Sequence, residues 1–87
     1  MKNKNNKKNQ KLNGSLNHST ETSLRKYFKT LNGHKPTNLY KFVIKEVERP
    51  LMKEVMKYTE NNQSEAAKIL GINRTTLRNK LKEYKII

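Results

Sequence analysis

The sequence predicts an all-α fold with four helices per chain, and three observations support this class. Apolar residues recur three and four positions apart between residues 19 and 60, which is the spacing of a helical face. After residue 61, cap residues and a glycine divide the chain into two short helices. Hydrophobic residues make up only 32% of the 87 residues, so the core must be thin, and we expect partner chains.

The net charge of +13 is the strongest feature of the composition. It exceeds what solubility alone would require, so a polyanion is the expected partner. The excess of Lys and Arg lies toward both ends of the chain, because residues 37–60 are nearly neutral.

Residues 1–18 are expected to form a disordered basic tail. Lys and Asn dominate this stretch, and after Met1 its only large apolar residues are Leu12 and Leu16. Burial therefore cannot offset the entropy that ordering would cost. Two interpretations stay open: an arm that lies along phosphates, or a solvated tail that reflects a genome rich in Lys and Asn codons.

The first helix is expected to begin at Ser19 or Thr20, because either side chain can cap a helix. Asn32 and Gly33 should end it, and Pro36 continues the break because it disfavours helical angles in the residue before it. One helical face carries four apolar side chains: Leu24, Tyr27, Phe28 and Leu31.

The second helix is expected to begin at Thr37 or Asn38 and to reach residue 59. One apolar stripe along it consists of Leu39, Phe42, Val43, Val47, Pro50, Leu51, Val55 and Tyr58, and a second consists of Tyr40, Ile44, Met52 and Met56. A surface this wide predicts a helix packed on two sides, so residues 19–60 are expected to supply dimerisation helices. The expected dimer core is Leu39, Phe42, Val43, Val47, Leu51 and Val55.

Pro50 allows two interpretations of this segment. Two helices could meet at Arg49 and Pro50, or one long helix could be kinked there at a cost of about 3 kcal/mol. The apolar spacing continues through Pro50 without a change of phase, and no Gly, Asn or Ser lies beside it. We therefore favour one kinked helix.

Residues 62–84 read N-Q-S-E-A-A-K-I-L-G-I-N-R-T-T-L-R-N-K-L-K-E-Y. Asn62 is a helix cap with Glu65 three residues later, and Gly71 permits the positive φ that ends a helix. Asn73 caps the next helix, and Ile72 can pack on Leu77 to fix the angle at which the chain enters that helix. Short helix, glycine turn and basic helix together predict a helix-turn-helix over residues 61–87.

The second helix of this unit has the composition of a recognition helix. Leu77 and Leu81, four residues apart, should face the core, which leaves a basic face outward. Such a helix enters the major groove of DNA with its N-terminal residues at base edges. Arg74 can pair with guanine through two hydrogen bonds. Asn73 and Thr76 can reach bases or phosphates, and the expected phosphate contacts are Arg78, Lys80 and Lys82.

The segments L-Y-K-F-V-I-K-E-V-E-R-P-L and V-M-K-Y-T-E-N-N-Q-S-E-A-A-K-I-L-G-I-N-R-T-T-L-R-N-K-L-K-E-Y carry a resemblance. Over roughly residues 20–84, the chain resembles the Fis family of nucleoid-associated DNA-binding proteins. Its C-terminal pattern is also similar to the DNA-binding domain of NtrC-type activators, which carry a large ATPase that this chain lacks.

The resemblance implies an intertwined homodimer with a four-helix core and a C-terminal helix-turn-helix at each end. It also implies recognition helices set closer than one DNA turn, so that double-stranded DNA must bend, with loose specificity and a preference for compressible A·T-rich centres. Asn62, Gln63 and Ser64 match phosphate-contacting positions of the family. The matches to its base-proximal positions are Asn73, Arg74 and Thr76.

Three departures from the family pattern have consequences. Asn79, which still belongs to the expected DNA-contacting set, replaces a usual Lys and weakens one contact. Lys85 replaces a terminating Gly, so the last helix is expected to run on or fray. Residues 1–18 lack the alternating pattern of the family's recombinase-activating hairpin, so we do not expect that activity.

Several classes of function are not expected. The chain has no Cys, and His18 and His34 lie in polar surroundings where exposure is the expected state. The scattered acids give neither a catalytic pair nor a metal site, so no enzyme activity, cofactor, metal or small-molecule substrate is expected. Met52 and Met56 are expected to fill the core. No secretory signal or apolar run long enough for a membrane span is present, so a soluble protein of the cytoplasmic nucleoid is expected.

A basic RNA-binding or ribosome-associated protein is the alternative function, because it would share the charge and the Lys-Asn tail. RNA-binding proteins usually stack bases on exposed aromatic side chains. The six aromatic residues of this chain instead fall on apolar helical faces, so DNA is favoured: Tyr27, Phe28, Tyr40, Phe42, Tyr58 and Tyr84.

Overall fold

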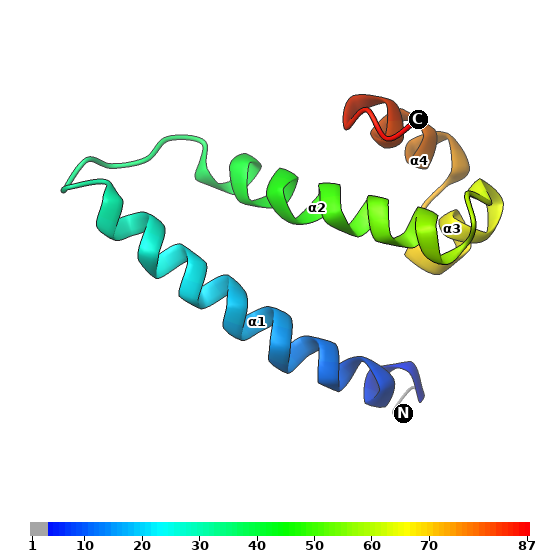
Figure 1. Cartoon of the computed structure of the whole chain (residues 1–87), viewed down its shortest axis with the longest axis horizontal. Coiled ribbons are helices and arrows are strands. Elements are labelled where there is room, and N and C mark those ends of the chain that lie inside the picture. Colours follow the sequence, from blue (N-terminus) through cyan, green and yellow to red (C-terminus); the bar gives the residue numbers. More distant parts are fainter. Residues whose placement is uncertain (1–3) are drawn as a thin grey trace. The chain divides into compact units, whose positions relative to one another are not determined.

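The computed structural model describes the backbone of residues 4–87 and the side chains from residue 14 onward. Four helices follow one another along the chain, and the described residues contain no strand (Figure 1). The predicted all-α class with four helices is therefore confirmed. The helices are α1 (Lys4–Thr30), α2 (Leu39–Tyr58), α3 (Gln63–Leu70) and α4 (Arg74–Glu83).

The chain divides into two compact units, Met1–Thr37 and Asn38–Ile87. The first contains α1 and the turn that follows it. The second contains α2, α3 and α4, and α3 packs against both of the other two helices. The buried hydrophobic side chains of the described residues all belong to the second unit.

Helix α1 begins fifteen residues earlier than the sequence predicts, at Lys4 rather than near Ser19. Residues 4–18, predicted to be disordered, are helical, and residues 1–3 lie outside the described part of the chain. The Thr20 hydroxyl does not cap a helix, because it donates to the carbonyl of Leu16 one turn back, at 2.8 Å. No proline interrupts residues 4–30, and their many lysines are good helix formers.

The end of α1 and the start of α2 agree with the sequence prediction. Asn32 and Gly33 have positive φ values of 50° and 84°, which no continuing α-helix can accommodate. Asn38 precedes α2 in the left-handed conformation and makes no side-chain cap hydrogen bond.

Helix α2 is one continuous helix with Pro50 inside it. Of the two interpretations of Pro50, the junction of two helices is wrong, and the single helix is confirmed. The helix continues because the residues on both sides of Pro50 keep helical hydrogen bonds, so one missing donor does not end it.

Helix α3 is fixed at both ends by the residues that the sequence predicts. The Asn62 side chain accepts a hydrogen bond from the Glu65 amide at 3.1 Å. Gly71, with φ 71°, ends the helix, and its amide donates to the Lys68 carbonyl while the Ile72 amide donates to that of Ala67. This pair of bonds is a Schellman motif, which satisfies carbonyls that the helix leaves free.

Helix α4 is capped by Asn73, whose side-chain oxygen accepts from the amides of Thr75 and Thr76 at 2.7 and 3.3 Å. The expectation that α4 runs on or frays at Lys85 is wrong. Lys85 has φ 57°, and the amides of Lys85 and Ile86 donate to the carbonyls of Lys82 and Leu81, which ends α4 in a second Schellman motif. Lys85 thus adopts the left-handed conformation that glycine adopts without strain.

The core of the second unit joins α2, α3 and α4. Leu77 and Leu81 of α4 are fully buried, as predicted, and Ala66 and Ala67 of α3 leave room for them to approach. Ile72 packs against the same cluster, in agreement with its predicted role at the start of α4. The complete core is Met52, Met56, Ala66, Ala67, Leu77, Leu81 and Tyr84.

Lys85→Gly should stabilise the folded chain by about 0.5–1 kcal/mol, because glycine relieves the strain of the left-handed conformation. Urea unfolding at fixed protein concentration measures the change. Lys85→Ala is the matched control, since it removes the same charge and keeps the strain. Equal stability of the Gly and Ala variants would contradict this explanation of how α4 ends.

Candidate nucleic-acid interface

The outward face of α4 is basic and open to solvent. Because Leu77 and Leu81 are fixed in the core, the opposite face of the helix points away from it. Among the predicted contacts, Gln63 and Lys80 are half-buried. The exposed ones are Asn62, Ser64, Asn73, Arg74, Thr76, Arg78, Asn79 and Lys82.

The N-terminal ends of α3 and α4 each carry an asparagine cap. Asn62 satisfies the amide of Glu65, and Asn73 satisfies those of Thr75 and Thr76, so the side-chain oxygens of both caps are already used. Their side-chain NH₂ groups remain able to donate outward. The first amides of a helix, together with its dipole, favour an anion at this end.

Lys80 does not share the outward direction of its neighbours. Its Nζ lies 3.0 Å from Oε1 of Glu48 on α2, and only 31% of its side chain is exposed. The Glu48 side chain is 20% exposed, so the pair is partly shielded from water. The structure therefore places Lys80 in an ion pair between α2 and α4.

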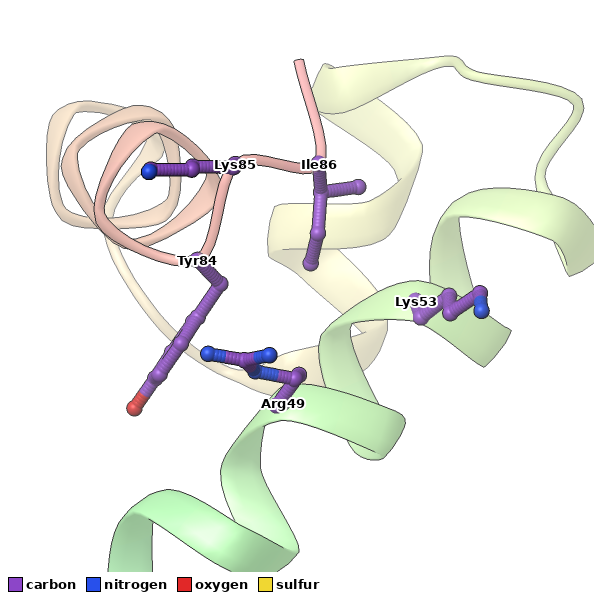
Figure 2. A pocket seen from close by; sticks show the side chains of 5 residues that line it. All are labelled: Arg49, Lys53, Tyr84, Lys85 and Ile86. Atoms are coloured by element: carbon purple, nitrogen blue, oxygen red, sulfur yellow. The ribbon is translucent and has the colours of Figure 1, made fainter.

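Tyr84 makes a second bond to the same carboxylate. Its hydroxyl donates to Oε1 of Glu48, the oxygen that also accepts from Lys80. The guanidinium carbon of Arg49 lies 5.6 Å from the centre of the Tyr84 ring, a cation–π distance. Figure 2 shows Arg49 and Tyr84 side by side, at a hollow lined by Arg49, Lys53, Tyr84, Lys85 and Ile86.

These contacts shift the pKa of both acidic groups. The hydrogen bond from Tyr84 lowers the pKa of Glu48, Lys80 lowers it further, and burial opposes them. The bond to Glu48 raises the pKa of Tyr84 to about 12, and burial adds to this shift. Both shifts favour one state, an ionised carboxylate that accepts from a protonated phenol.

Comparisons with known proteins show which family this sequence resembles. The family model described as "Bacterial regulatory protein, Fis family" matches residues 43–84, from α2 to the residue after α4. Proteins named "DNA-binding protein Fis" from Mannheimia haemolytica and Haemophilus ducreyi are each 48% identical over 75 residues, covering 86% of this chain and 76% of theirs. The Fis protein of Vibrio cholerae is 51% identical over 69 residues, covering 79% of this chain and 70% of its own length. The chain belongs to the Fis family.

The residues matched by the family model include Glu48, Lys80 and Tyr84. Sequence analysis missed the contacts among these three residues. Glu48 is separated from Lys80 by 32 residues and from Tyr84 by 36. No periodicity or cap pattern relates residues so far apart. A second ion pair between α2 and α4 joins Lys45 and Glu83 at 4.0 Å and is more exposed. Sequence analysis missed it for the same reason.

The histidines of this Fis-family chain and the methionines of α2 lie where the sequence predicts. His18 and His34 are exposed, as predicted, and Met52 and Met56 are core residues, also as predicted. Within the part whose side chains are described, no cluster of His, Asp or Glu could hold a metal ion. None of the described helices is both long and apolar enough to cross a bilayer.

The six aromatic residues, which the sequence places on apolar helical faces, differ in how far a single chain buries them. Tyr84 is buried, whereas Tyr40 and Tyr58 are about four-fifths exposed. Both lie on α2. The comparisons with Fis proteins give no support to the RNA-binding alternative.

The stability contributed by Tyr84 should be lost between about pH 10 and pH 12. The folded state raises the pKa of the phenol, so this contribution is complete below the unfolded pKa and disappears as pH rises through the folded one. Urea unfolding across this range should show a larger loss in the wild type than in Tyr84→Phe. Tyr58→Phe, at an exposed tyrosine, is the control and should retain it. The same pH dependence in Tyr84→Phe as in the wild type would contradict the bond to Glu48.

Proposed function

We propose that this chain is a DNA-binding and DNA-bending regulator of the Fis type, which acts as a homodimer on double-stranded DNA at the nucleoid. The observation that carries the proposal is the basic, exposed face of α4, held outward by two buried leucines. A helix-turn-helix presents its second helix to the major groove in this way. The relatives that cover most of this chain are named as DNA-binding proteins.

Within this proposal, α4 supplies the contacts to bases. Arg74 lies at the first position of α4, where a recognition helix approaches base edges, and its guanidinium can bond both acceptors of guanine. Asn73 and Thr76 flank it at the same end. Arg78, Asn79 and Lys82 lie further along α4 and would contact phosphates.

The N-terminus of α3 would hold a phosphate. Asn62 caps the helix, and Gln63 and Ser64 are its first two residues. Backbone amides at this position, the helix dipole and the hydroxyl of Ser64 all favour an anion. Such a contact fixes the register of α4 in the groove without distinguishing one sequence from another.

The dimer is supported by the apolar side chains that α2 exposes. Phe42 and Leu51 are 49% and 46% exposed, and Val47 is 38% exposed, although each lies on the predicted core stripe. Leu39, Val43 and Val55 are half-buried. Several exposed apolar side chains on one helix are typical of an interface, and a second copy of α2 is the natural partner for them.

A dimer of this type would bend DNA, because the family resemblance sets the two recognition helices closer than one helical turn of about 34 Å. Both can enter successive major grooves only if the duplex curves. The cost of bending depends on the sequence between the two contacts, so the preference would be largely indirect. Regulation and organisation of the nucleoid would follow from such bending.

Arg74→Ala should reduce the preference for a specific site over random duplex by about 1–3 kcal/mol, the value of a bidentate contact to guanine. Lys82→Ala is the comparison variant and should weaken binding to both duplexes equally, because phosphates carry no sequence information. Mobility-shift titrations at one salt concentration give both ratios. Equal losses on specific and random duplex for Arg74→Ala would reject its role in base recognition.

Leu51→Lys should abolish dimerisation, because it would place two charges in the apolar contact between copies of α2. Sedimentation equilibrium at micromolar concentration should give twice the chain mass for the wild type. Ile69→Lys is the matched control, since Ile69 is 50% exposed but lies on α3. A folded wild-type monomer at this concentration would contradict the dimer.

A further inference from the structure

We infer that Lys80 is a positioning residue and not a phosphate contact: with Tyr84 and Glu48 it fixes the orientation of α4 on α2, and thereby the bend in the bound DNA. The inference rests on the proposed function, because it concerns how the same interface is held. It changes the role of one of the basic residues of α4.

Two donors on α4 converge on one acceptor on α2. Lys80 and Tyr84 are four residues apart, so their side chains lie on the same side of the helix, one turn from each other. Both reach Oε1 of Glu48, Lys80 at 3.0 Å. Contacts at two heights along α4 resist rotation about its axis, and they add directional restraints to the packing of the buried leucines.

Because the Glu48 carboxylate is partly buried, Lys80 cannot easily leave this ion pair to contact a phosphate. If Lys80 turned outward, Glu48 would keep its charge with only the phenol to stabilise it, while its side chain is four-fifths removed from water. The guanidinium of Arg49 lies over the Tyr84 ring, which helps to hold the phenol in place. Lys82 has no such acidic partner and is exposed, so it can meet a phosphate without losing a contact.

The orientation of α4 on α2 has a consequence for DNA. In the proposed dimer, α2 joins the two chains and α4 enters the groove, so the angle between them sets the distance between the two recognition helices. A rigid angle forces the duplex to curve. If the angle between α2 and α4 were less rigid, α4 could adapt to straighter DNA. The preference of the protein for DNA that is already bent would then be weaker.

The salt dependence of binding separates the two roles of Lys80. Each phosphate contact contributes about 0.9 to the slope of log affinity against log salt, and a dimer carries two copies of each lysine. Lys82→Gln should therefore lower the slope by about 1.8. Lys80→Gln, which removes the same charge two residues away, should leave the slope unchanged.

The bend is measured as the ratio of affinities for a small DNA circle and for the same sequence as a linear duplex. Lys80→Gln, Glu48→Gln and Tyr84→Phe should each reduce this ratio several-fold. Glu54→Gln is the charge-matched control for Glu48→Gln, because Glu54 lies on the same helix in an exposed pair with Lys57. It should leave the ratio unchanged. Circular dichroism checks that each variant is folded, and Tyr84→Phe decides the matter if either charge variant is not.

Each outcome is informative. A slope for Lys80→Gln as low as that of Lys82→Gln would overturn the inference and restore Lys80 as a phosphate contact, while leaving the proposed function intact. An unchanged circle-to-linear ratio in all three variants would also overturn it. If the wild type fails to bind duplex DNA, the proposed function fails, and the inference fails with it.

Discussion

The burial of Leu77 and Leu81 against α2 and α3 is the contact on which the rest of the second unit depends. Each leucine is fully removed from water, which contributes about 1.5–3 kcal/mol. The alanines of α3 matter because larger side chains would hold α3 away from the helices that it packs against. Once one face of α4 is fixed inward, its period of 3.6 residues directs the basic side chains outward. The interface is therefore a consequence of the core.

The helix ends fix the positions of the helices that form this core. Each of the three helices of the second unit is followed by a residue with positive φ: Glu60, and Asn61 after it, follow α2, Gly71 follows α3 and Lys85 follows α4. All three are closed by the same pair of backbone hydrogen bonds. Only Gly71 is recognisable from sequence, because the left-handed conformation is unstrained for glycine alone. At Lys85 the hydrogen bonds and the contact of Ile86 with the core impose the turn on a residue that does not favour it.

The basic residues of α4 fall into two groups that composition does not distinguish. Arg74, Arg78 and Lys82 face solvent, whereas Lys80 faces Glu48. A count of positive charge thus overstates what the helix offers to a polyanion, and part of the charge connects α4 to the helix that carries it. On α2, the exposed apolar side chains around Val47 show a surface that a single chain leaves open to solvent.

The sequence could predict those features that local spacing encodes. The asparagine caps, the glycine turn, the inward leucines and the uninterrupted stripe through Pro50 all depend on residues within two turns of one another, and the structure agrees with each. The start of α1 could not be predicted in this way. Threonine is a good N-cap residue, and only the three-dimensional structure shows that the Thr20 hydroxyl bonds to the Leu16 carbonyl within a continuing helix.

The sequence by itself determined the helical class, the limits of α2 and α3, the start of α4, and the basic face that points to DNA. Tertiary structure alone decided the direction of Lys80, the partner of Tyr84 and the sharp end of α4 at Lys85. The physical reason is distance along the chain. A hydrogen bond between residues more than thirty positions apart forms only after packing has brought two helices together, and no local pattern records it.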